Sequence, residues 1–93
     1  VLKPLATAVA DGDTIYGVIR ASGFNQDGRT NGITAPSAPA QTDLLADVWR
    51  RAGVDPATIS YVEAHGTGTE LGDPIEVEAL SAAFRQFTPA RGF

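Results

Sequence analysis

Apolar residues form two extended runs and three segments of helical spacing along this chain. Residues 14–22 and 59–64 are rich in β-branched and apolar side chains, which favours β-strands. The first run carries few polar residues, and this is typical of a strand that is mostly buried. Gly17 interrupts it, which indicates a bulge or a close approach of another backbone.

The helical segments are recognised by the residues at their ends. The spacing predicts helices over residues 4–10, 38–52 and 73–84. We expect Gly12 to close the first helix in a left-handed conformation, since glycine carries no side chain. Ser37 and Gly53 have the character of the cap and the stop of the second helix. We expect Asp73 to be the cap and Pro74 the first residue of the third helix.

One face of the second predicted helix is apolar, which indicates that it packs against a core. The residues on this face are Leu44, Leu45, Val48, Trp49 and Ala52. Trp49 could serve as a stacking residue for a ligand, but we interpret it as a core aromatic residue that faces the sheet. Arg50 and Arg51 then point away from the core and are expected to be solvated.

Strands and helices alternate along the chain, which predicts an α/β fold. Between the first strand and the second helix, residues 23–37 form a long loop with three glycines and a proline before its final serine. Loops of this length are uncommon unless they line a site. We therefore expect the part from Asn25 to Ala35 to lie near the rim of an active site.

The composition of the chain excludes several classes of protein. The chain has 93 residues, no cysteine, one histidine and a formal net charge of −4. Without cysteine there is neither a disulfide framework nor a thiolate metal site, and one histidine leaves no zinc constellation, so no metal is expected. The absence of a basic cluster argues against nucleic-acid binding. The sequence contains no membrane span and no signal peptide, and we expect a cytoplasmic protein.

The only histidine, His65, lies where the second predicted strand gives way to a glycine loop. A lone histidine is more often a structural residue. Ligands of open α/β sheets bind at this end of the strands, however, and this position strengthens the case for a catalytic or binding role of His65. Asp73 and Glu76 have the spacing of a capping box, so a structural role is expected for Asp73. The glycine loop is a poor match to a dinucleotide fingerprint, because Leu71 stands where a third small residue is required.

The loop, with its flanks, resembles the histidine motif of β-ketoacyl synthases, most closely the ketosynthase domains of modular type I polyketide synthases. The motifs that carry the resemblance are Val1 to Leu5, Ala10 to Asp13, Asn25 to Gly28, Asn31 with Gly32, Thr34 to Ser37 with Gln41, Glu63 to Thr69, and Leu71 to Leu80. Because several separated motifs agree in order and spacing, the resemblance is highly specific and extends to about Phe87.

The resemblance implies a thiolase-like, layered α/β/α/β/α fold, of which residues 1–93 would form part. Ketosynthases use a cysteine nucleophile, the histidine of this loop and a second histidine that follows later with a lysine. The chain contains neither the cysteine nor the second histidine. We therefore expect an internal piece of a ketosynthase domain, lacking the cysteine-bearing N-terminal part and the C-terminal part, that does not catalyse condensation by itself.

The resemblance also implies the chemistry. The parent would elongate acyl chains by decarboxylative Claisen condensation with malonyl-type thioesters, and His65 would stabilise the enolate. Thr67 and Thr69 would hydrogen-bond the phosphopantetheine arm of an acyl carrier protein, although threonines in loops also commonly bond to nearby backbone. No cofactor is expected to bind directly, since the arm serves as the substrate carrier. The complete protein is expected to be a homodimer.

Two other interpretations remain open at this point. The parent could be a ketosynthase-like module that binds and transfers acyl chains without elongating them. The chain could also be a separate small protein that acts as a partner or has no function of its own. A cysteine or second histidine missing from the parent would favour the first of these, and a cooperative thermal melt of the 93 residues would favour the second.

Overall fold

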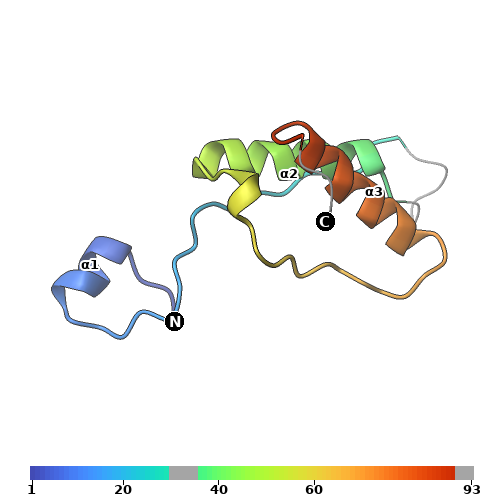
Figure 1. Cartoon of the computed structure of the whole chain (residues 1–93). Helices are drawn as coiled ribbons and strands as arrows, with labels where there is room; N and C mark the ends of the chain where they lie inside the picture. The colour runs from blue at the N-terminus through green and yellow to red at the C-terminus, as the bar shows by residue number, and fades with distance from the viewer. Residues whose placement is uncertain (30–35, 90–93) are drawn as a thin grey trace.

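The computed structural model describes residues 1–29 and 36–89, and in these residues the regular elements are all helical (Figure 1). The order is α1 (Leu5–Ala10), α2 (Ala38–Ala52), the short 3-10 helix η1 (Pro56–Thr58) and α3 (Gly72–Arg85). The three predicted helices are confirmed to within about one residue at each end. None of the helices in the described part is long and apolar enough to cross a membrane.

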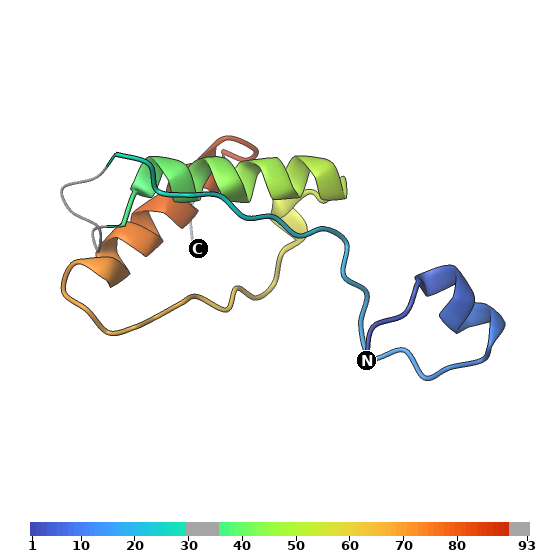
Figure 2. The same ribbon diagram turned by 180° about the vertical axis from the view of Figure 1, so that it is seen from behind.

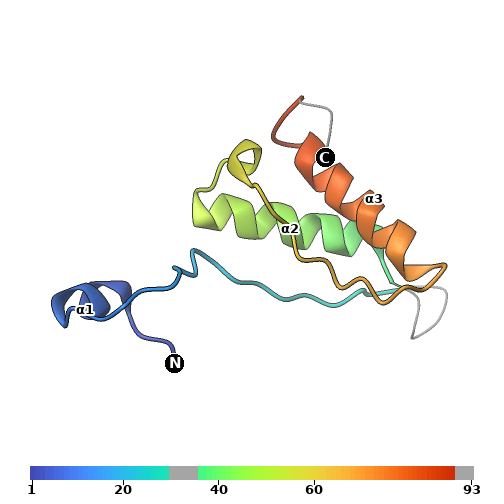
Figure 3. The same cartoon turned by 60° about the horizontal axis from the view of Figure 1, so that its bottom comes forward.

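Helices α2 and α3 pack against each other and hold most of the buried residues (Figures 1 and 3). Ala46 of α2 and Ala79 and Ala83 of α3 are almost fully buried. Their small side chains let the two helix backbones approach closely. The Thr42 hydroxyl lies 2.8 Å from the carbonyl oxygen of Ala38 and 3.2 Å from that of Ala79, so it bridges the helices at the N-terminal end of α2.

An aromatic cluster fills the other end of this helix pair. The Trp49 ring lies 4.8 Å from that of Phe84 and 5.8 Å from that of Phe87, both measured between ring centroids. Trp49 is thus a packing residue, as predicted, but it faces α3 and not a sheet. Arg50 is exposed, as expected, and its guanidinium also lies 5.2 Å from the Phe87 ring centroid and donates to Gln86. Arg51 is exposed and pairs with Asp47 at 2.8 Å.

The ends of α2 follow the sequence rules. The Ser37 hydroxyl accepts a 3.3 Å hydrogen bond from the backbone N–H of Ala40, which satisfies one of the unpaired donors of the first turn. Gly53 ends the helix with φ of 61°, a left-handed conformation that glycine adopts without steric cost. Sequence alone was therefore enough to place this helix.

Helix α1 lies away from the α2–α3 pair, which gives the chain an elongated shape of 50 × 32 × 23 Å (Figure 1). Gly12 follows it with φ of 68°, as expected. The Lys3 ammonium contacts the carboxylates of Asp11 and Asp13, each at 2.5 Å, and so closes the loop around this helix. These two carboxylates, Asp11 foremost, raise the pKa of Lys3.

The prediction of strands at residues 14–22 and 59–64 is wrong for this chain. Both segments lack regular secondary structure, and the described residues contain no β-ladder. A strand needs a neighbouring backbone to satisfy its N–H and C=O groups, and neither segment has one here. Most of their apolar side chains, including Tyr16, Ile19 and Tyr61, are exposed. Gly17 has no atom near enough to indicate a close approach. Within residues 1–29 and 36–89, the helices of the expected layered fold are present and its sheets are not.

The segment after residue 19 crosses the outer side of α2 (Figure 2). Arg20 donates to the carbonyl oxygen of Ala52 at 3.4 Å, and Asn25 donates to that of Ala40 at 2.6 Å. Between these two contacts, Gly23 lies so close to α2 that a Cβ atom there would be 2.6 Å from Cγ2 of Val48. The segment is thus fixed at both ends of α2, and Asp27 follows directly after it.

Candidate active site

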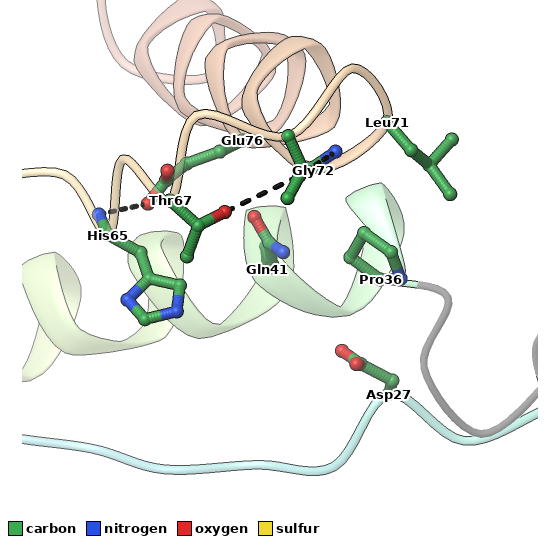
Figure 4. Close-up of a pocket in the computed structure, with 9 residues that line it drawn as sticks. Asp27, Pro36, Gln41, His65, Thr67, Leu71, Gly72 and Glu76 are labelled. Atoms are coloured by element: carbon green, nitrogen blue, oxygen red, sulfur yellow. Dashed lines mark hydrogen bonds between the residues drawn. The ribbon is translucent and has the colours of Figure 1, made fainter.

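An open cavity of about 440 Å³ lies between the start of α2, the start of α3 and the loop that precedes α3 (Figure 4). Its lining residues are Asp27, Pro36, Gln41, His65, Thr67, Thr69, Leu71, Gly72 and Glu76. All three residues predicted for the site, His65, Thr67 and Thr69, are therefore brought together in one cavity. Asp27 agrees with the expected position of the loop from Asn25 to Ala35, of which residues 30–35 lie outside the described residues.

The backbone beside His65 is held by a carboxylate from α3. One oxygen of Glu76 accepts a 2.6 Å hydrogen bond from the N–H of His65, and the other accepts a 3.0 Å bond from the N–H of Gly66. The N–H groups of Gly66 and His65, in that order of effect, lower the pKa of Glu76. In Figure 4 the His65 ring lies on the side away from this carboxylate, so the ring nitrogens stay available to the cavity.

A second carboxylate holds the next part of the loop. Asp73 accepts a 3.1 Å hydrogen bond from the N–H of Gly68. Gly66 and Gly68 have φ of 57° and 76°, left-handed conformations that turn these N–H groups with little strain. Residues in the first two turns of α3 thus hold three backbone N–H groups of the loop. These are the N–H groups of His65, Gly66 and Gly68.

The predicted capping box of Asp73 and Glu76 is wrong. Helix α3 begins at Gly72, one residue before Asp73, and its cap residue Leu71 makes no side-chain hydrogen bond. The Thr69 hydroxyl accepts a 2.9 Å hydrogen bond from the N–H of Gly72. Thr69 therefore caps the first turn of α3 in place of Asp73. This leaves both carboxylates free to accept from the loop. The structural role expected for Asp73 stands, although its partner is Gly68 and not its own helix.

The hydroxyls of Thr67 and Thr69 make contacts within the loop. Oγ1 of Thr67 lies 3.4 Å from Oγ1 of Thr69, and Thr69 also accepts from Gly72. A hydroxyl has one donor and two acceptor positions, so both retain hydrogen-bonding capacity toward the cavity. Their contact with a pantetheine arm stays a prediction.

Six lining residues were not predicted for the site, and three of them, Asp27, Gln41 and Glu76, carry polar side chains. Glu76 was noticed only for its spacing from Asp73. Asp27 lay within a motif of the family resemblance, and this could have marked it. Gln41 was likewise part of a motif of the resemblance, but as a polar residue near the start of an amphipathic helix it carried no sign of its role. Among the described residues, no three His, Cys, Asp or Glu side chains come together as a group that could hold a metal ion.

The chain belongs to the β-ketoacyl synthase family, because its residues 16–91 match the model of the β-ketoacyl synthase C-terminal domain. Within this family its relatives are polyketide synthases. Over 92 residues it is 65% identical to polyketide synthase ThaG of Burkholderia thailandensis, which covers 99% of this chain and 2% of that protein. It is 59% identical to polyketide synthase PksL of Bacillus subtilis over its whole length, again 2% of the relative.

Solved structures give the same result. The chain superimposes with a TM-score of 0.93 and 58% identity on the ketosynthase from module 6 of the bacillaene synthase of Bacillus subtilis 168. The match covers 98% of this chain and 16% of that ketosynthase. The oxazolomycin ketosynthase domain OzmH KS7 of Streptomyces albus JA3453 gives a TM-score of 0.88 at 42% identity, covering 92% of this chain and 15% of the other. The resemblance noted in the sequence is confirmed.

Proposed function

We propose that this chain contributes the first active-site histidine to a ketosynthase that elongates carrier-bound acyl chains. The observation that carries the proposal is the placement of His65. Its ring lines the cavity, while its backbone is fixed from behind by Glu76. The complete protein would be an acyltransferase of polyketide biosynthesis, a multifunctional synthase of which this chain is a small part.

The role of His65 follows from the charge that develops in the reaction. When a malonyl thioester loses carbon dioxide, the electron pair of the broken C–C bond passes to the α-carbon and the thioester oxygen as an enolate. An imidazole N–H of His65 donates to that oxygen. One such donor lowers the barrier by about 3 to 4 kcal/mol. The α-carbon then attacks the acyl thioester on the cysteine, whose thiolate leaves, and the product is a β-ketothioester longer by two carbons.

The remaining parts of the machinery come from the family resemblance. Since this chain has no cysteine and one histidine, the nucleophile and the second histidine would be supplied by other parts of the synthase. The complete ketosynthase would have the thiolase-like layered fold and act as a homodimer. The partners would be an acyl carrier protein and its acyl and malonyl-type thioesters. Thr67 and Thr69, which line the cavity together with His65, would hydrogen-bond the phosphopantetheine arm.

The test is His65→Ala in the complete synthase that carries this sequence. Decarboxylation of malonyl carrier protein is followed by carbon dioxide release, and acylation of the cysteine by intact mass. We expect decarboxylation to fall by about 10²- to 10³-fold while acylation persists. Unchanged decarboxylation would refute the role of His65. A wild-type protein that becomes acylated but neither decarboxylates nor elongates would refute elongation and favour an acyl-transfer module.

A further inference from the structure

The amide of Gln41 differs from the Glu76 carboxylate and the Thr69 hydroxyl, which line the same cavity. Both oxygens of Glu76 accept from the loop backbone, and the Thr69 hydroxyl accepts from Gly72. The Gln41 side chain also lines the cavity, but among the described residues it makes no hydrogen bond. Its carbonyl oxygen and NH2 group are therefore available to a ligand.

The base of this side chain is held firmly. The N–H of Gln41 donates to the carbonyl oxygen of Ser37 at 3.0 Å, and the preceding carbonyl, that of Ala40, accepts from Asn25. The next residue, Thr42, bridges α2 and α3 through its hydroxyl. The turn of α2 that carries Gln41 is thus fixed both to α3 and to the segment that crosses its outer side.

Gln41 and the loop residues reach the cavity from different elements. Gln41 projects from α2, whereas Thr67 and His65 belong to the loop before α3 (Figure 4). A ligand that enters between these elements can therefore be held from two directions, by the threonine hydroxyls and by the amide of Gln41.

The chemistry of Gln41 indicates what it would bind. A primary amide donates and accepts at once, so it can pair with the N–H and C=O of a secondary amide. The amide region of a pantetheine arm is neutral, which suits a cavity that also carries the carboxylates of Asp27 and Glu76.

We propose that Gln41 hydrogen-bonds an amide group of the carrier arm and so sets the distance between the thioester and His65. The inference rests on the proposed function, because it presumes that carrier-bound thioesters enter this cavity. Gln41 would then be a substrate-positioning residue that holds the arm from α2, whereas Thr67 and Thr69 hold it from the loop before α3.

The experiment compares two malonyl thioesters with two forms of the complete synthase. One thioester carries a pantetheine chain with its amides, and the other a plain alkyl chain of equal length. In Gln41→Met the amide is replaced by an apolar side chain of similar size. We expect kcat/KM for decarboxylation of the pantetheine thioester to fall by about 3- to 10-fold, the value of one neutral hydrogen bond. The value for the alkyl thioester should not change.

Controls make the result specific. Gln86→Met removes an exposed glutamine outside the cavity, and both substrates should react as with wild type. Gln41→Asn withdraws the amide by one methylene group and should again affect only the pantetheine thioester. Equal losses on both substrates, or no loss on either, would overturn the role of Gln41. A wild-type synthase that decarboxylates neither substrate would instead refute the proposed function itself.

Discussion

The carboxylate of Glu76 accepts a hydrogen bond from the backbone N–H of His65 at 2.6 Å, across eleven residues of sequence. The same carboxylate accepts from Gly66, so the peptide units before and after His65 are both attached to α3. The orientation of the ring is therefore coupled to a helix that is itself packed against α2. A change at Glu76 should therefore reach the chemistry through the position of His65.

Glu76→Gln tests this coupling. The amide has one acceptor oxygen, and its NH2 group would face the N–H that the second carboxylate oxygen now accepts from. We expect kcat for malonyl decarboxylation by the complete synthase to fall by about tenfold, in the range of a hydrogen bond to a charged group. The matched control is Glu78→Gln, an equal charge change on an exposed residue of the same helix. Similar rates in the two variants would contradict the coupling.

Acid should weaken the same attachment. Because hydrogen bonds lower the pKa of Glu76 in the folded state, the unfolded state binds its proton more readily. The contribution of Glu76 to stability is then complete above the ordinary glutamate pKa of about 4.3 and is lost as pH falls through that value and below it. Thermal unfolding midpoints measured between about pH 6 and pH 3 should decline less steeply in Glu76→Gln than in wild type. Parallel declines would exclude this contribution.

Gly23→Ala should loosen the segment that leads to the cavity. The added Cβ would lie 2.6 Å from Cγ2 of Val48 and 2.8 Å from a guanidinium nitrogen of Arg51. Overpacking of this kind costs about 1 to 3 kcal/mol. Gly17→Ala is the matched control, because no atom lies within 4 Å of its added Cβ. Denaturant unfolding of the complete ketosynthase should separate the two variants, and equal midpoints would refute the close packing of Gly23 on α2.

Thr42→Val removes the hydroxyl that bridges α2 and α3 and keeps the shape of the side chain. Thr42→Ser keeps the hydroxyl and loses a methyl group. Since the hydroxyl reaches the carbonyl oxygens of both Ala38 and Ala79, we expect the valine variant to lose about 1 kcal/mol of unfolding free energy and the serine variant less. Chemical denaturation measures both. A valine variant as stable as wild type would mean that packing alone joins the helices here.

Local rules were sufficient to predict the helices of this chain. Ser37 and Gly53 mark the ends of α2 by interactions within a few residues, and these depend little on the rest of the molecule. The prediction of strands was wrong because a strand depends on residues far away in the sequence. Residues 14–22 and 59–64 have the composition of strands, but a ladder needs a partner backbone, which composition cannot supply.

The sequence motif predicted which residues form the site, but not which hydrogen bonds hold them in place. His65, Thr67 and Thr69 were found because they belong to one recognisable loop, and they share one cavity. The partners of Glu76 and Asp73 were assigned wrongly because a capping box and a loop clamp use the same residues at the same spacing. Which N–H groups the carboxylates meet depends on where α3 begins, and this start differs from the predicted one by a single residue.

The exposed extended segments bear on how synthases of this kind can be recombined. Tyr16, Ile19 and Phe24 present apolar side chains on a stretch whose backbone groups are largely unpaired, a surface that invites adhesion between molecules. A chimera joined within residues 13–29 or 59–71 would separate these segments from the surroundings that match them. Junctions for module exchange are therefore better placed outside this chain altogether, so that α2, α3 and both segments are inherited from one parent.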